Sequence, residues 1–215
     1  YLSFLIAKSV FYFIRIEYIV TFLKIQMSQS WIDSLLNSPR GHLFVRVSDD
    51  FIRENAAKAA EFGSIDNYQD LLPIILSNDN QVNESLQNDA EKLYGIIHRY
   101  FLMTEKGRLL MMERQRQGDF PKCPRFLCHD FTCVPFGSSN ECKRAEVQMF
   151  CPNCTDVYNY KISPTIDGAY FGPYWVHFLM NEHPEIAGDE EVESYTPHVF
   201  GFNVYLQPNA PPKNS

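Results

Sequence analysis

Four cysteines form two closely spaced pairs in the second half of the chain. Cys123 and Cys128 are separated by four residues, Cys151 and Cys154 by two, and 22 residues lie between the pairs. Two such pairs are how a zinc ribbon offers four thiolates to one tetrahedral ion. Because the protein would fill all four positions, no position would remain for water or substrate. We therefore expect one Zn²⁺ per chain, with a structural role.

Other cysteine chemistries fit this sequence less well. A redox C-x-x-C motif is expected beside a βαβ unit, which the surrounding sequence lacks. Disulfides are compatible with six cysteines, but short-spaced pairs without a clear signal peptide favour a reducing compartment. Cys133 and Cys142 belong to no short-spaced pair, so we interpret them as free, partly buried thiols. His129 could compete as a ligand, and we expect that it does not.

The charge of the cysteine-rich segment indicates what it contacts. Zinc ribbons commonly bind either nucleic acid or protein. Residues 122–164 carry five basic and four acidic side chains, and the whole chain of 215 residues has a net charge of −7. Because phosphate binding requires a basic face, we expect a protein partner and no nucleic acid. A zinc-ribbon transcription or RNA-processing factor remains the alternative. A metal hydrolase or redox enzyme would need an open ligand position or reactive thiols.

The sequence before the cysteines predicts a helical domain over residues 27–118. Ser48 is a candidate N-cap of a short helix with acidic residues in its first turn, and residues 67–76 predict a second short helix. Apolar residues then recur at helical spacing over residues 93–101. Thr104 with Gly107 suggests a break before a further helix.

Gly118 is well placed as the C-cap of that last helix, and the character of the chain changes after it. Residues 119–180 predict a small β domain, with strands at 147–150 and 157–160. The remaining residues, 181–215, predict a C-terminal hairpin and tail, which makes the chain an α+β protein. The apolar residues Val147, Met149 and Val157 beside the cysteines are our candidates for facing a second copy of the chain.

Residues 1–26 are apolar and aromatic but carry four charged side chains. Their longest uncharged stretch is shorter than the roughly 18–20 residues that span a bilayer, and no clean cleavage site follows. An interfacial amphipathic helix is one interpretation. We expect instead a dispensable, non-native leader before Met27, and no membrane partner.

Several motifs together resemble the regulatory β subunit of casein kinase II. They are Cys-Pro-Arg-Phe-Leu-Cys at 123–128, the Pro-Phe-Gly turn at 135–137, Cys-Pro-Asn-Cys-Thr-Asp-Val-Tyr at 151–158, Asp-Gly-Ala-Tyr-Phe-Gly at 167–172, Leu-Tyr-Gly-Ile-Ile-His at 93–98 and Gln-Gly-Asp-Phe at 117–120. The similarity runs from about Trp31 to Leu206. It is far more specific than any single motif.

This resemblance implies a helical N-terminal domain followed by a zinc ribbon through which two subunits dimerise. It also implies that each dimer docks two catalytic alpha subunits of casein kinase II, a serine/threonine kinase, in the cytoplasm and nucleus. Such a subunit is regulatory and modulates stability and substrate choice. The sequence agrees that the chain is no kinase itself, since it contains no H-R-D, no D-F-G and no G-x-G-x-x-G motif.

The family's docking element is a C-terminal hairpin with an aromatic-Gly-Phe tip, which falls here on Phe200, Gly201 and Phe202. Exposed aromatic anchors are typical interface hot spots, and Gly201 would permit a tight turn. The alternative is that this apolar face packs on its own domain. The resemblance also makes Ser30 a possible phosphorylation site, with Asp33 three residues later. We favour an ordinary helix N-cap for Ser30.

Overall fold

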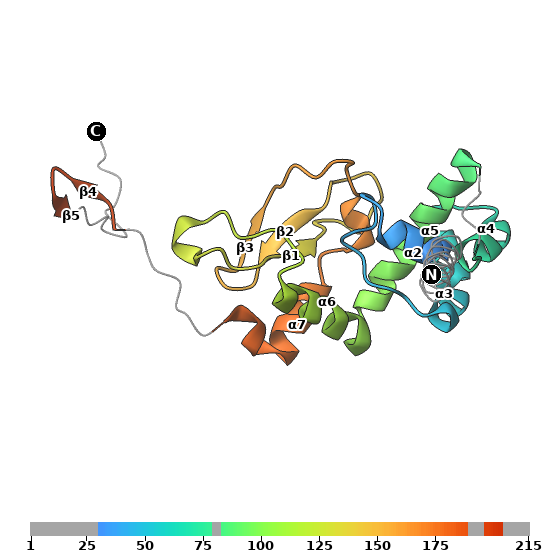
Figure 1. Cartoon of the computed structure of the whole chain (residues 1–215), viewed down its shortest axis with the longest axis horizontal. Coiled ribbons are helices and arrows are strands. Elements are labelled where there is room, and N and C mark those ends of the chain that lie inside the picture. Colours follow the sequence, from blue (N-terminus) through green and yellow to red (C-terminus); the bar gives the residue numbers. More distant parts are fainter. Residues whose placement is uncertain (1–29, 79–82, 189–195, 204–215) are drawn as a thin grey trace, which may run out of the picture.

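The computed structural model describes residues 30–78, 83–188 and 196–203 (Figure 1). The helices are α2 (Trp31–Leu36), α3 (Asp49–Gly63), α4 (Tyr68–Ile75), α5 (Glu84–Leu102), α6 (Glu105–Gln117) and α7 (Trp175–Glu182). The strands are β1 (Val134–Phe136), β2 (Gln148–Cys151), β3 (Asp156–Tyr158), β4 (His198–Val199) and β5 (Phe202–Asn203). Helices therefore precede a small sheet, which confirms the predicted α+β class. The predicted leader, residues 1–26, lies outside the described residues.

The predicted helices are present, and the predicted break before the last of them lies at Met103 and Thr104. α3 begins directly after Ser48 but runs for 15 residues rather than as a short helix. α6 ends at Gly118, whose φ of 79° is the left-handed C-cap conformation. Gly107 does not break the chain, because it lies inside α6 while Thr104 caps the helix by accepting the Gly107 N–H at 3.2 Å. A Cβ at Gly107 would lie 2.1 Å from the Phe101 carbonyl oxygen, so this glycine allows close packing.

Helix α5 is the centre of the helical part, and residues 93–99 in its C-terminal half are all buried. It packs against α3, α4 and α6. Its side chains also satisfy a buried connecting segment, residues 43–47, which no named strand accompanies. The Tyr94 hydroxyl accepts the Val47 N–H at 3.1 Å, and His98 Nε2 accepts the Val45 N–H at 3.1 Å. Buried backbone groups need such partners, so these two side chains fix where the connection runs.

The sheet is antiparallel in the order β1-β2-β3. Strands β2 and β3 fall within two residues of the predicted segments. The Pro-Phe-Gly turn named in the sequence is instead mostly strand, since Val134 pairs with Phe150 and Phe136 with Gln148. Pro135 is tolerated because β1 is an edge strand, where a missing N–H costs no ladder hydrogen bond.

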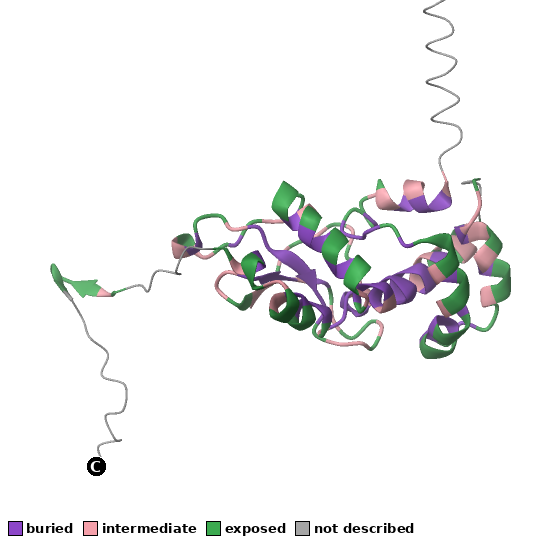
Figure 2. Cartoon of the chain, turned by 90° about the horizontal axis from the view of Figure 1, so that it is seen from below, coloured by how far each residue is buried: buried purple, intermediate pink, exposed green. Residues whose placement is uncertain are grey.

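One hydrophobic core runs from the helices into the ribbon, as the continuous buried regions of Figure 2 show. The Tyr170 ring lies against α5 at Gly95, where a Cβ would approach the ring to 2.4 Å. Helix α7, which the sequence did not predict, packs against α6. Arg108 on α6 donates two hydrogen bonds to the Glu182 carboxylate on α7, at 2.9 and 2.7 Å. These contacts hold the ribbon in a defined position beside the helices.

Candidate metal centre

Two short loops bring the four cysteines of the predicted zinc ribbon together. In the first loop, the Cys123 N–H donates to the Phe131 carbonyl oxygen at 2.7 Å, so the chain folds back on itself around Cys128. The second loop leaves the end of β2 at Cys151, whose carbonyl oxygen accepts the Thr155 N–H at 2.9 Å. The turn closed by that bond points Cys154 back toward Cys151.

The four sulfurs lie within 4.8 Å of one another. Cys123 Sγ is 3.7 Å from Cys154 Sγ, and Cys128 Sγ is 3.5 Å from Cys151 Sγ. These separations are too long for disulfide bonds, which measure about 2.05 Å. A tetrahedron with Zn–S bonds of about 2.3 Å has sulfur–sulfur edges of about 3.8 Å. The donor set and its spacing therefore fit one tetrahedral zinc ion.

The surroundings of the sulfurs suit a charged centre. Cys123, Cys128 and Cys151 are buried and Cys154 is half-buried. Asn153 Nδ2 donates to Cys128 Sγ at 3.4 Å, and the Tyr158 hydroxyl lies 3.3 Å from Cys154 Sγ. Burial raises the pKa of the Cys123 thiol to about 12, so a metal has to displace a proton that the free thiol would hold. A hydrogen-bond donor such as Asn153 stabilises a thiolate and tunes the metal that the thiolate binds.

The remaining sulfur and imidazole candidates stay outside the group. His129 is exposed and, within residues 30–78, 83–188 and 196–203, the one group of three or more potential ligands consists of the four cysteines. Cys133 is fully buried and Cys142 is half-buried. Neither is in a disulfide, and Cys133 is more deeply buried than the sequence suggested.

The apolar residues chosen as dimer candidates lie in different environments. Val147 and Met149 are 3% and 0% exposed in the single chain, so their side chains are already used in its own core. Val157 is half-buried and keeps some surface. The sequence reasoning missed Phe126, which is 91% exposed on a short 3-10 helix between Cys123 and Cys128. Its position could have revealed it, because a four-residue loop between two ligands is too short to bury a large ring.

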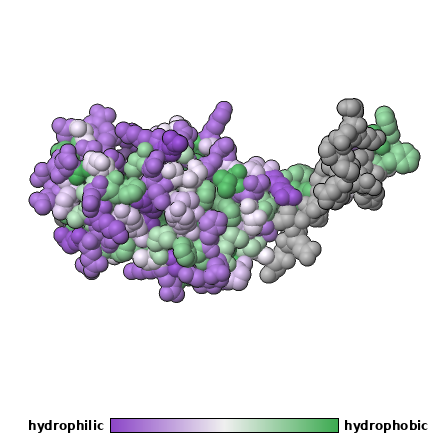
Figure 3. Space-filling view, turned by 180° about the vertical axis from the view of Figure 1, so that it is seen from behind, coloured by the Kyte–Doolittle hydropathy of each residue, from purple (hydrophilic) through white to green (hydrophobic). Residues whose placement is uncertain are grey.

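The aromatic tip forms a separate hairpin at the C-terminal end of the described residues. Val199 pairs with Phe202, leaving Phe200 and Gly201 as a two-residue turn. Phe200 is 97% and Phe202 76% exposed. Figure 3 shows a hydrophobic group of atoms away from the body of the molecule, and Figure 2 shows the hairpin as exposed. The structure thus separates the hairpin from the cysteine cluster.

Ser30 is the N-cap of α2. Its hydroxyl accepts the Asp33 N–H at 3.2 Å and donates to the Asp33 carboxylate at 2.7 Å. This geometry is the capping arrangement that the sequence favoured.

Among the described residues, every helix is too short or too polar to cross a membrane.

Residues 30–203 match the model of the casein kinase II regulatory subunit family. Casein kinase II subunit beta of Schizosaccharomyces pombe is 34% identical over 83% of this chain and 80% of its own length. Subunit beta' of Drosophila melanogaster is 30% identical over 82% of this chain and 84% of its own length. Subunit beta' of Saccharomyces cerevisiae is 31% identical over 82% of this chain and 73% of its own length.

The match covers both the helical part and the ribbon, and the four-cysteine geometry agrees with the motifs that suggested the resemblance. The chain belongs to the casein kinase II regulatory subunit family, which is non-catalytic.

Proposed function

We propose that this chain homodimerises through a structural zinc ribbon and docks two catalytic subunits of casein kinase II, so that it regulates their stability and substrate choice. The observation that most supports this function is the hairpin tip, which presents two exposed aromatic rings. Rings held out in this way cost solvation free energy unless a partner covers them. The family membership identifies the class of that partner.

Zinc would serve as the support of the dimerisation surface. Cys123, Cys128, Cys151 and Cys154 would hold it, and the ion would supply four bonds that strands of three or four residues cannot replace. The four protein ligands leave no position for a substrate. The ribbon therefore orders a surface and performs no reaction.

The part of that surface best suited to a second copy is Phe126, and Val157 on β3 also keeps some exposed surface. A nearly fully exposed Phe on the loop that carries two ligands depends on the metal for its position. Phe126→Glu should convert the dimer to a monomer in native mass spectrometry while each chain keeps one zinc. Phe178→Glu is the matched control, because Phe178 is an exposed Phe on α7 outside the ribbon loops. A Phe126→Glu dimer as stable as the wild type would contradict this interface.

Kinase docking is tested at the hairpin. Phe202→Ala should weaken capture of the casein kinase II catalytic subunit about thirtyfold, the effect of losing an aromatic hot spot of about 2 kcal/mol. The dimer mass and zinc content should not change. Phe62→Ala removes an exposed Phe from α3 and should leave capture intact. Undiminished capture by the Phe202→Ala protein would count against docking at this tip.

A further inference from the structure

A cavity of about 570 Å³ lies between the helical part of the chain and the ribbon. Its walls come from α2, from the segment between α2 and α3, from α5, and from ribbon residues 143–146, 164–167 and 170. Pockets of roughly 300–1,000 Å³ commonly hold small organic ligands. The cavity includes neither the four cysteines nor the hairpin, so the proposed function makes no use of it.

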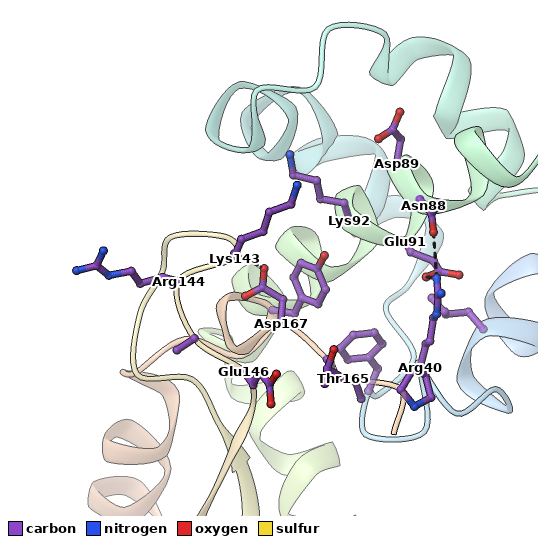
Figure 4. Close-up of a pocket in the computed structure, with 16 residues that line it drawn as sticks. Arg40, Asn88, Asp89, Glu91, Lys92, Lys143, Arg144, Glu146, Thr165 and Asp167 are labelled. Atoms are coloured by element: carbon purple, nitrogen blue, oxygen red, sulfur yellow. Dashed lines mark hydrogen bonds and ion pairs between the residues drawn. The ribbon is translucent and has the colours of Figure 1, made fainter. Parts of the chain in front are cut away.

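Two ammonium groups converge at one end of this cavity. Lys92 from α5 and Lys143 from the ribbon point toward each other in Figure 4. Lys92 Nζ donates to the Gly63 carbonyl oxygen at 2.6 Å, which is a neutral partner. Lys143 forms no ion pair with any residue that the structure describes. A shared anion would relieve the repulsion between the two ammonium groups and satisfy both of them.

Of the four carboxylates that line the cavity, only that of Asp167 lies beside the lysine pair in Figure 4. Glu91 is paired with Arg40 at 3.1 Å. The Asp167 carboxylate accepts the Lys143 N–H at 2.6 Å and the Ala169 N–H at 3.0 Å. Asp89 and Glu146 lie apart from the lysine pair in Figure 4. At the lysine end, two ammonium groups therefore face one carboxylate.

The backbone at Lys143 is also unusual. Its φ of 63° lies in the left-handed region, which residues with long side chains seldom adopt. The Asp167 carboxylate holds this conformation by accepting the Lys143 N–H. Strain of this kind persists where the surroundings enforce it, and it is commonest at functional sites. The conformation places the Lys143 side chain on the wall of the cavity.

Other parts of the wall are apolar. Leu35, Phe44 and Ile166 are buried, and Tyr170 is half-buried, with all four lining the cavity. We propose that the cavity binds a small organic phosphate, with the phosphate group between Lys92 and Lys143 and an apolar or aromatic body against Phe44 and Tyr170. Because Lys92 belongs to the helical part and Lys143 to the ribbon, the ligand would tie the two parts together.

The test is isothermal titration calorimetry of the full chain with AMP, which combines one phosphate with an aromatic body, at fixed ionic strength. One AMP should bind per chain. Lys143→Asn and Lys92→Met should each weaken binding about tenfold, because each removes a charge-assisted contact to the phosphate. Asn is compatible with the left-handed backbone at position 143, so that variant removes the charge and keeps the loop.

Lys106→Gln is the matched control, since Lys106 is an exposed lysine on α6 that does not line the cavity. The Lys106→Gln protein should bind AMP as the wild type does. Adenosine, which lacks the phosphate group, should not bind to the wild-type protein. The circular dichroism spectrum of each variant identifies any that fails to fold. The proposal is overturned if AMP does not bind at about 10 mM, a concentration that would reveal even millimolar affinity. It is equally overturned if both cavity variants bind AMP like the wild type, or if adenosine binds as well as AMP. None of these results depends on dimerisation or kinase docking.

Discussion

His98 shows how one side chain can join three segments of the chain. Its Nε2 accepts the Val45 N–H at 3.1 Å, and its Nδ1 lies 3.0 Å from the Tyr170 carbonyl oxygen. Because the first bond needs an unprotonated Nε2, the proton of the neutral ring belongs on Nδ1, where it can be donated to Tyr170. Burial lowers the pKa of His98 to about 4. Folding therefore requires the neutral ring.

The stability of the protein should depend on pH through this ring. The folded pKa of about 4 lies below the ordinary value of 6.5, so the unfolded chain takes up a proton first as the pH falls. The unfolding free energy should fall by about 2 kcal/mol between pH 7 and pH 5, and by about 3 kcal/mol once pH 4 is passed. Urea denaturation at these pH values measures the slope.

His98→Gln should flatten that slope, whereas His42→Gln should keep it, because His42 is exposed. A His98→Gln protein with the wild-type slope would show that other groups control the acid response.

The periodicity of residues 93–101 predicted a helix, and His98 is one of these residues. Its role could not be predicted, because both of its hydrogen-bond partners lie far away in sequence.

At the scale of elements, the hairpin turn uses a residue that the turn itself disfavours. Phe200 and Gly201 have φ values of 50° and 87°, the pattern of a type I′ turn, which favours Asn-Gly. A ring at the first turn position costs on the order of 1 kcal/mol of backbone strain. The presence of Phe there is explained if the ring is needed for binding.

Exchanging the residue at position 200 should separate turn stability from kinase capture. Phe200→Asn relaxes the turn but removes the ring, and we expect capture of the casein kinase II catalytic subunit to weaken about thirtyfold. Phe200→Tyr keeps the ring and should bind within a few-fold of the wild type. Surface plasmon resonance measures both variants. Equal binding by the Asn variant would mean that the turn, and not its ring, matters.

The contact between α6 and α7 depends on the ion pair of Arg108 and Glu182, in which the arginine is buried and the glutamate is exposed. Arg108 is 6% exposed, and its guanidinium also donates to the Met103 carbonyl oxygen at 2.6 Å. Glu182→Ala should lower the unfolding free energy by about 2 kcal/mol, since it strands a buried charge. Arg108→Met combined with Glu182→Leu should recover part of this loss, because no charge is then left unpaired. Urea denaturation of Glu182→Ala and of the double variant tests this. A double variant that loses at least as much unfolding free energy as Glu182→Ala would contradict it.

Elements with a strong local signal could be predicted, and those fixed by distant contacts could not. Helices α3 to α6 carry their signals in their own residues, although the Ser48 and Asn67 side chains at the starts of α3 and α4 make no capping hydrogen bond. The α7 sequence is rich in aromatic residues and does not by itself predict a helix, and the position of α7 depends on its packing against α6. β1 contains a proline and resembles a turn until Phe150 pairs with Val134. The four zinc ligands were predictable because their spacing is local, whereas the exposure of Phe126 and the burial of Met149 depend on the folded sheet.

At the scale of the whole molecule, the ribbon and the helices differ in what holds them. The helical part has long helices around a buried α5, while the ribbon has strands of three or four residues and a proposed metal. Removing zinc should therefore unfold the ribbon and break the dimer while most of the helical circular dichroism signal remains. Native mass spectrometry before and after chelation should show a two-zinc dimer and then a metal-free monomer. A metal-free dimer would overturn the support role of zinc.

The number of reactive thiols reports the same loss of zinc through the cysteine side chains. In the folded protein Cys142 is half-buried and outside the cysteine group, so one thiol should react quickly with a thiol reagent. After chelation we expect five more, because Cys133 is buried in the ribbon core and should be released together with the four ligands. Adding zinc back should protect all five again, since the metal restores the fold that covers Cys133. If chelation exposes no further thiols, the four sulfurs do not hold the metal, and the ribbon must be stable through its own packing.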